Sequence, residues 1–272
     1  MSNLHSLNRD FIWEDRPLTN LRKLSVPQVR QFNESGFCIV KDVVSADLLQ
    51  ELRSEADRFE RAAVSSSLLD DKGEELASYE KDELTFTCNL VSRSSVFADF
   101  YQNDLFVGVT ADLLADSCRL YWDQAVYKHP QKGGEFPWHQ DNGYTFVSPQ
   151  QYLTCWLALS DAPVESGCPW VIPGAHREGT YRHIKKPYGL EIDGVTALIE
   201  RFGETASPVL AGDMVVFSSL TPHKTGPNLS SDIRKALIIQ FIPDLSVRAD
   251  TDGEVLLNDP VLNPMLTSLS GD

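Results

Sequence analysis

The chain has 272 residues, with 24 Lys and Arg against 39 Asp and Glu, and therefore a formal net charge of −15. Hydrophobic residues make up 42% and charged residues 23%, which is an ordinary composition for a globular protein. The acidic balance disfavours binding to nucleic acid or to an anionic membrane, because both partners require a basic face. A chain of this length can bury a sizeable core without disulfides or structural metals.

The five cysteines are an odd number with no CxxC pair, and four of them lie in apolar or strand-like runs. This pattern predicts buried free thiols and disfavours a disulfide framework or a thiolate zinc site. The N-terminal segment has no apolar stretch of signal-peptide length, and no run reaches the ~20 apolar residues of a membrane span. We therefore expect a soluble, cytoplasmic protein.

Helix periodicity dominates the first half of the chain. The predicted elements are a helix over 25–35, a strand over 37–44 and helices over 45–64, 94–102 and 104–116. Ser25 and Ser45 are expected as N-caps, Pro27 stands in the first turn of its helix, and Gly36 ends that helix. The acidic segment 66–83 has no periodicity, which favours a solvated loop over a mobile lid.

Short apolar strands separated by Gly, Pro and Asp dominate the second half. The predicted strands cover 118–128, 136–141, 151–160, 168–173, 207–210, 213–218, 222–226 and 234–242. This spacing favours a sandwich or jelly roll over βαβ units, which would place helices between the strands. The predicted fold class is mainly β with flanking helices.

Three segments are expected along the chain. Residues 1–24 are polar and irregular and would form a surface arm, 25–243 would form one domain, and 244–272 would be a loosely attached C-terminal tail. Within the domain, 45–116 would be mostly helical and 118–243 would form the jelly-roll core.

The sequence lacks the starting motifs of several large enzyme classes. No GxGxxG, GxxxxGK[ST], GxSxG or HExxH occurs, which disfavours dinucleotide binding, P-loop phosphate transfer and serine hydrolysis. Among the six histidines, His139 stands two residues before Asp141 in an apolar stretch. Residues i and i+2 of a strand project to the same face, so this imidazole and this carboxylate can bind one metal ion.

A second histidine, His223, follows a distant apolar strand and completes the pattern. Two His and one carboxylate on one face of an octahedron leave three positions open, as in non-haem Fe(II) oxygenases. Two open positions can hold a 2-oxo acid and the third can take O2. Arg234 begins a later apolar strand, where it can bind a carboxylate bidentately, and Thr225 can add a hydroxyl to the same anion.

With these residues in place, the chain resembles the phytanoyl-CoA dioxygenase family of Fe(II)- and 2-oxoglutarate-dependent oxygenases over residues 26–243. The resemblance also rests on the stretches Lys128–Pro130, Tyr152–Leu159 and Glu165–His176. It implies a double-stranded β-helix (jelly-roll or cupin-like) core with helices packed on one sheet. These motifs are specific for the family and poorly specific for the substrate.

The resemblance implies a role for each candidate residue. Fe(II) would be ligated by His139, Asp141 and His223. The distal carboxylate of the co-substrate 2-oxoglutarate would be held by Arg234 and Thr225.

Two further residues would serve the co-substrate by the same resemblance. Trp156 would line its pocket, and Gln124 would hydrogen-bond it. The implied reaction is hydroxylation of an unactivated C–H bond of a small-molecule metabolite, with release of succinate and CO2. Two alternatives stay open: a non-enzymatic or differently metallated cupin-like protein that needs no Arg234, and an oxygenase that modifies a peptide.

The segment 177–186 is basic within an acidic chain, with four Arg and Lys residues and one Glu. One interpretation is an ordinary solvated loop. The other is a site near the mouth of the jelly roll that recognises an anionic group of the substrate, with Arg182 and Lys186 as its cations.

Overall fold

The computed structural model describes residues 3–63, 83–131, 134–250 and 253–267 in full, together with the backbone of 67–69 and 75–78. The α-helices within these residues are α1 Val26–Ser35, α2 Ala46–Ala62, α3 Ser95–Tyr101, α4 Asp104–Leu113 and α5 Val195–Phe202. The strands are β1 Phe37–Val40, β2 Ser67–Leu69, β3 Glu75–Ser78, β4 Leu84–Cys88, β5 Cys118–Lys128, β6 Phe136–His139, β7 Val147–Ser148, β8 Leu153–Ala158, β9 Pro169–Val171, β10 His183–Lys186, β11 Gly189–Ile192, β12 Thr205–Ala206, β13 Met214–Ser218, β14 His223–Thr225, β15 Arg234–Pro243, β16 Val247–Asp250 and β17 Gly253–Leu256. No described helix is long and apolar enough to cross a membrane.

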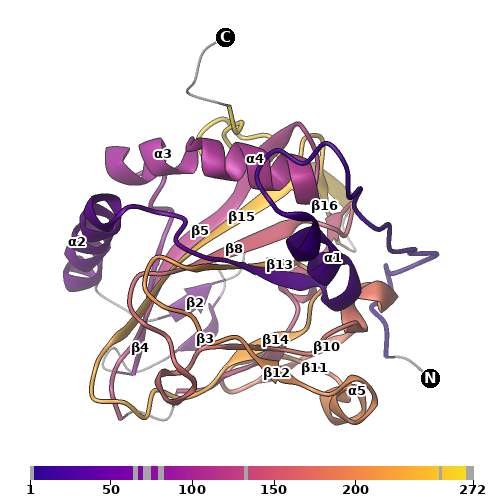
Figure 1. Ribbon diagram of the computed structural model, residues 1–272. Coiled ribbons are helices and arrows are strands. Elements are labelled where there is room, and N and C mark those ends of the chain that lie inside the picture. The colour runs from indigo at the N-terminus through magenta and orange to yellow at the C-terminus, as the bar shows by residue number, and fades with distance from the viewer. Residues whose placement is uncertain are drawn as a thin grey trace.

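Two antiparallel sheets form the centre of the molecule (Figure 1). The larger sheet has the strand order β1-β13-β8-β15-β5-β4, and the smaller has the order β12-β9-β14-β6. Figure 1 shows α3 and α4 lying over the larger sheet, with the smaller sheet and the β10–β11 hairpin on its other side. The arrangement is the mainly β architecture that the strand spacing predicts.

Alternate side chains of β8 pack on opposite faces of the larger sheet, one face toward the helices and the other toward the interior between the sheets. Cys155 and Leu157 belong to the core cluster that includes residues of α2, α3 and α4, whereas Trp156 and Ala158 belong to a second cluster on the opposite face. A strand has a side-chain period of two, so one sheet buries both faces, one against helices and one against the other sheet. The interior face carries the site described below.

The capping predictions for the first two helices agree with the structure. The Ser45 hydroxyl accepts a hydrogen bond from the Leu48 N–H at 3.2 Å, as an N-cap does. Gly36 ends α1 with φ near +82°, a left-handed conformation that glycine adopts without strain. The strand expected over 37–44 ends earlier, at Val40.

Several predicted strand boundaries differ from those of the structure. The expected strand over 207–210 is wrong: β12 occupies Thr205–Ala206, and Val209 makes only an isolated bridge with Ala162. The prediction missed β4 together with the hairpin of β10 and β11 and the short helix α5. Within 66–83, the backbones of β2 and β3 pair, and the hypothesis of a lid lies outside the described residues.

The N-terminal segment is irregular, as expected, yet it is anchored in the core. Trp13 is buried and packs edge-on against the His176 ring, with centroids 4.3 Å apart. The Asp112 carboxylate in α4 accepts hydrogen bonds from the backbone N–H groups of residues 22–24 at 2.7–2.9 Å. A helix-borne carboxylate therefore fixes the end of the arm.

The segment after Pro243, which we expect as a C-terminal tail, forms the strands β16 and β17 and contacts the start of β5 at residues 264–266. β16 pairs with β7 and β17, and Met265 bridges Arg119 at the start of β5. The physical reason is that β4 pairs only with residues 124–128 of β5. The first half of β5 would otherwise present unpaired backbone groups, which the C-terminal segment covers.

His176 is a structural histidine in this core. It is fully buried, and its Nε2–H donates to the Asn33 carbonyl at 3.3 Å. Burial lowers the pKa of His176 to about 4. The folded protein therefore holds this imidazole neutral at a pH at which the unfolded chain would protonate it.

We predict that His176 makes stability fall with acidification between pH 6.5 and pH 4. The unfolded state takes up a proton as the pH falls through 6.5, and the folded state does so only near pH 4. The free energy of unfolding therefore falls by about 3 kcal/mol over this interval. Urea denaturation at pH 7 and pH 4 measures this loss. His176→Gln should lose less stability over the same interval by about that amount, and an equal loss in both proteins would contradict the prediction.

Candidate metal centre and its cavity

Two histidines face each other across neighbouring strands of the smaller sheet. His139 at the end of β6 and His223 at the start of β14 are direct register partners, and their ring centroids are 4.1 Å apart. The Nδ1–H of His139 donates to the Pro137 carbonyl at 2.8 Å, and that of His223 donates to the Thr221 carbonyl at 3.0 Å. A carbonyl can only accept, so both rings keep the Nε2 lone pair for a metal ion.

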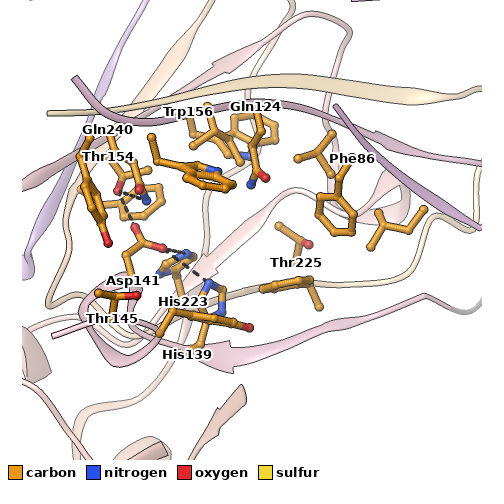
Figure 2. Close-up of a pocket in the computed structure, with 18 of the residues that line it drawn as sticks. Phe86, Gln124, His139, Asp141, Thr145, Thr154, Trp156, His223, Thr225 and Gln240 are labelled. Atoms are coloured by element: carbon orange, nitrogen blue, oxygen red, sulfur yellow. Dashed lines mark hydrogen bonds and ion pairs between the residues drawn. The ribbon is translucent and has the colours of Figure 1, made fainter. Parts of the chain in front are cut away.

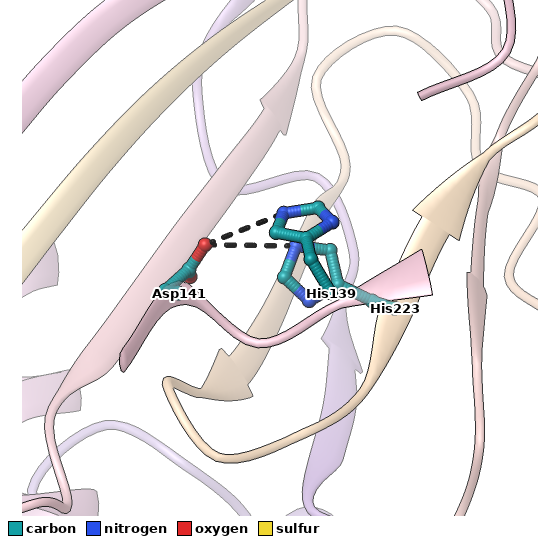
Figure 3. Close-up of side chains that lie close together, drawn as sticks. All are labelled: His139, Asp141 and His223. Atoms are coloured by element: carbon teal, nitrogen blue, oxygen red, sulfur yellow. Dashed lines mark ion pairs between the residues drawn. The ribbon is translucent and has the colours of Figure 1, made fainter. Parts of the chain in front are cut away.

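Asp141 completes the cluster from a turn. Its Oδ1 lies 3.7 Å from the Nε2 of both His139 and His223 (Figure 3). The three possible ligand atoms lie within 4.8 Å of one another. The prediction that Asp141 shares a strand with His139 is wrong, because β6 ends at His139 and Asp141 begins the 3-10 turn Asp141–Gly143. The turn still directs the carboxylate toward the two imidazoles.

The peptide between the two ligands is fixed by its own contacts. The backbone N–H of Gln140 donates to His183 Nε2 at 2.9 Å, and the Gln140 side-chain amide donates to the carbonyls of Gly179 and Leu220. The N–H of Tyr181 donates to the Gln140 side-chain oxygen at 2.6 Å. These bonds hold the ligand segment against residues 179–183 and against Leu220.

A polar chain from the larger sheet orients the Asp141 carboxylate. Thr154 Oγ1 donates to Asp141 Oδ2, and Gln240 Nε2 donates to Thr154 Oγ1 at 3.2 Å (Figure 2). Thr154 on β8 and Gln240 on β15 are register partners. Burial raises the pKa of Asp141, while His223 and the Thr154 bond favour its charged form. One carboxylate oxygen is therefore occupied and the other faces the imidazoles.

Arg234 is a buried cation with unsatisfied donors. Its side chain is 2% exposed, and within the described part of the chain its Nε and Nη1 have no hydrogen-bond partner. The guanidinium carbon lies 5.3 Å from the centre of the Trp156 ring. Burial lowers the pKa of Arg234 to about 10, so the group stays charged at neutral pH. Two nitrogens of this buried guanidinium therefore have N–H donors available to an anionic ligand such as a carboxylate.

Lys128 is a second buried cation beside Arg234. The two residues are register partners on β5 and β15. Lys128 Nζ donates to the carbonyls of Gly134, Thr225 and Gly226 at 2.6–2.9 Å. Burial lowers the pKa of Lys128, and the neighbouring Arg234 lowers it further. Its three donors are satisfied by backbone, so Arg234 is the cation of this pair that is available to a ligand.

One cavity of about 140 Å³ connects the metal cluster with Arg234. In Figure 2, Gln124, Thr154, Trp156 and Gln240 of the larger sheet lie on one side of it, and the triad with Thr225 lies on the other. Aromatic rings make up much of the remaining wall, namely Phe86, Tyr121, Trp122, Phe136, Tyr144, Tyr152 and Phe217. Cavities of this kind, apolar with a few directed polar groups, are typical of small-molecule sites.

The structure brings most of the predicted site residues together. The residues that were predicted and that line this cavity are His139, Asp141, His223, Arg234, Thr225, Trp156 and Gln124.

The basic segment behaves differently. Arg182 forms an ion pair with Asp193, and Lys186 lies 3.3 Å from Glu191. Neither side chain lines the cavity. The excess of positive charge in 177–186 is balanced by acidic residues that are near in space and lie outside that stretch of sequence. Substrate binding by these two residues stays a prediction, and their ion pairs argue against it.

Sequence reasoning missed several residues that matter for the site. Thr154 projects from β8 to the same face as Trp156, and Gln240 projects from β15 to the same face as Arg234. The alternation of side chains along a strand was therefore the signal that could have found them. His183 belongs to the basic segment 177–186 in the sequence. In the structure its Nε2 accepts a hydrogen bond from the Gln140 N–H, between the two metal ligands His139 and Asp141. No sequence signal pointed to this role.

The family assignment follows from comparison with known sequences. The profile of the phytanoyl-CoA dioxygenase (PhyH) family matches residues 32–236. The chain belongs to this family. As a PhyH-family protein it is related to 2-oxoglutarate-dependent non-haem iron oxygenases, and it carries their His-Asp-His facial triad.

Relatives of this PhyH-family protein are distant in sequence. A phytanoyl-CoA dioxygenase of Arabidopsis thaliana is 28% identical over 148 residues, which are 54% of this chain and 52% of the relative. An ectoine dioxygenase of Nocardia farcinica is 23% identical over 231 residues, which are 79% of this chain and 76% of the relative. The chain spans 40–52% of the length of three curated relatives that it matches.

Solved structures share the fold of this PhyH-family protein. The alpha-ketoglutarate-dependent carbocyclase SnoK from nogalamycin biosynthesis has a TM-score of 0.75 and 20% identity, over 90% of this chain and 97% of SnoK. EctD from S. alaskensis, determined with 2-oxoglutarate and 5-hydroxyectoine, has a TM-score of 0.70 and 20% identity, over 96% of this chain and 94% of EctD. The matches confirm the predicted double-stranded β-helix fold.

We predict that Thr154→Val weakens metal binding by about 10- to 100-fold, because the carboxylate of Asp141 loses the donor that orients it. Isothermal titration of Ni(II) into the purified protein measures the affinity. Thr110→Val is the matched control, since its hydroxyl donates to the Phe106 carbonyl inside α4. Equal Ni(II) affinity in the Thr154 variant and the wild type would contradict the assigned role.

Proposed function

We propose that the protein is an Fe(II)- and 2-oxoglutarate-dependent dioxygenase that hydroxylates a C–H bond of a small molecule. The observation that carries the proposal is that one cavity holds both the His-Asp-His triad and the unpartnered guanidinium of Arg234. Two imidazoles and one carboxylate suit Fe(II) and leave three positions open. A buried Arg without a carboxylate partner in the described chain calls for an anionic ligand.

The residues present fit both groups. His139, Asp141 and His223 would hold the iron, and Arg234 with Thr225 would hold the distal carboxylate of 2-oxoglutarate. Once bound, iron and 2-oxoglutarate supply the oxidising chemistry, in which 2-oxoglutarate and O2 are consumed and succinate and CO2 are released.

The remaining roles belong to the protein itself. The Thr154–Gln240 pair holds the Asp141 carboxylate in one orientation. Trp156 lines the cavity beside the Arg234 guanidinium, and Gln124 would donate a hydrogen bond to the co-substrate. These groups position the reactants, and positioning of this kind contributes much of an enzyme's rate enhancement.

Relatives support the reaction class. They include an ectoine dioxygenase and a methylphosphonate hydroxylase of Gimesia maris, which is 29% identical over 134 residues, 47% of this chain and 47% of the relative. The names of both describe oxidation of small molecules, which favours a small-molecule substrate over a peptide. All five cysteines are free thiols, which supports a reducing, cytoplasmic compartment.

The competing function is a cupin-like metal-binding protein without catalysis. Such a protein would have no use for a buried Arg234 with free N–H groups, which is why the oxygenase is favoured. Titration of 2-oxoglutarate into the metal-loaded protein separates the two functions.

We predict that Arg234→Met weakens 2-oxoglutarate binding to the Ni(II)-loaded protein by about 100-fold, because two charged hydrogen bonds are lost. Isothermal titration measures the dissociation constant. Lys186→Met removes the same charge outside the cavity and should leave the affinity unchanged. If wild-type protein loaded with Ni(II) does not bind 2-oxoglutarate, the oxygenase function is refuted.

We also predict that Asp141→Ala abolishes succinate release from 2-oxoglutarate in the presence of Fe(II) and O2, because the metal loses its anionic ligand. Asp116→Ala, at an exposed carboxylate paired with Arg22, serves as the control and should retain the wild-type rate. Succinate release at the wild-type rate by the Asp141 variant would refute the ligand assignment.

A further inference from the structure

The cavity has two chemically different ends. Arg234 and Gln240 line it from the same strand, β15, and are six residues apart. With a rise of about 3.3 Å per residue, their backbones are separated by about 20 Å. We call the part around Arg234 and Lys128 the cation end, and the part around Tyr152 and Gln240 the tyrosine end.

The tyrosine end contains a buried hydroxyl with nothing to bind. Tyr152 is 1% exposed, and within the described residues its Oη has no hydrogen-bond partner. The residue is held in place because its N–H donates to Ser219 Oγ at 3.1 Å and its carbonyl accepts from the Ser219 N–H at 2.8 Å. A buried hydroxyl without a partner destabilises the free protein, and a ligand oxygen in the cavity would satisfy it.

Aromatic rings pack against the ring of Tyr152 and against the two histidine ligands. Tyr121 and Tyr152 meet edge-on with centroids 5.2 Å apart. Tyr144 meets the His139 ring in the same way at 5.3 Å, and Phe217 lies 4.4 Å from the His223 ring. Such walls favour planar or cyclic ligands, which present a large apolar face to them.

The tyrosine end offers no counter-charge to an anion. Among the described lining residues, the Lys and Arg side chains are Lys128 and Arg234, and both lie at the cation end. The charged side chain next to Tyr152 is Asp141, which would be a ligand of the metal and supplies no positive charge to an anion. Arg182 and Lys186 are paired outside the cavity. A carboxylate or phosphate bound here would lose hydration without gaining a lysine or arginine partner among the described lining residues.

We propose that the tyrosine end is the substrate site, and that it takes an uncharged, ring-bearing compound whose carbonyl or hydroxyl oxygen accepts a hydrogen bond from Tyr152. This inference rests on the proposed function, because iron and 2-oxoglutarate must occupy the triad and the cation end. The expected substrates are therefore neutral cyclic molecules, and acyl-CoA thioesters and free acids are disfavoured.

Four single-ring probes test the inference on anaerobic protein loaded with Fe(II) and saturating 2-oxoglutarate. Acetophenone is neutral and has an acceptor oxygen, benzoate is its anionic analogue, α-methylstyrene lacks the oxygen, and trimethylphenylammonium is a cation. Binding is followed by calorimetry and by perturbation of the visible charge-transfer band of the Fe(II)–2-oxoglutarate chelate. We expect acetophenone to bind at least tenfold more tightly than either charged probe.

The variant Tyr152→Phe separates the hydroxyl from the rest of the wall. It should weaken acetophenone binding about tenfold and leave α-methylstyrene binding unchanged. Its melting temperature should equal or exceed that of the wild type, because the removed hydroxyl has no partner. The control Tyr101→Phe loses a bond to the Pro264 carbonyl at 2.8 Å, so it should melt lower and bind acetophenone normally.

Two failures are distinguishable. Absence of the charge-transfer band in the wild type means that 2-oxoglutarate does not chelate the metal, and the proposed function itself fails. With the band present, the inference alone is overturned if a charged probe binds as tightly as acetophenone. It is equally overturned if no probe binds or if Tyr152→Phe has no effect on acetophenone.

Discussion

Two positive charges buried side by side between the sheets constrain this molecule more than any other feature. Lys128 and Arg234 are register partners on adjacent strands, and both are almost fully excluded from solvent. Removing a cation from water has a free-energy cost that only close acceptors can offset. The chain supplies three carbonyls to Lys128, from the segment before β6 and from the end of β14. These strands carry the two histidines, so the bonds of one lysine tie the metal-binding sheet to the larger sheet.

The charge on Arg234 has a different consequence. Its Nε and Nη1 have no hydrogen-bond partner within the described chain, which is why we propose that this side chain binds the carboxylate of a ligand. The same principle operates at the opposite end of the cavity, where a hydroxyl is buried without a partner. In both places a buried polar group has no hydrogen-bond partner among the described residues, and the interior between them is lined by rings and by the metal ligands.

Much of this arrangement could be predicted from sequence because it depends on period-two alternation. The spacing of His139 and Asp141, and the position of Arg234 at the start of an apolar strand, placed these side chains on interior faces. The error at Asp141, which lies in a turn and not in a strand, left the conclusion intact because the turn directs the carboxylate the same way. What sequence could not show was pairing across long separations. Arg177 of the basic segment pairs with Asp15 in the N-terminal arm, and residues 264–266 pair with the edge of β5 that the short β4 leaves open.

The three metal ligands are held by two different kinds of structure. His139 and His223 are fixed by the register of two paired strands, so neither can move without breaking the ladder. Asp141 belongs to a three-residue turn and is held by a side-chain contact with Thr154. The carboxylate is thus the ligand that depends least on strand pairing. A substitution in this turn can replace it while the paired histidines keep their positions. A scaffold built in this way can alter the anionic ligand of its metal, and with it the chemistry at the centre, without rebuilding the fold.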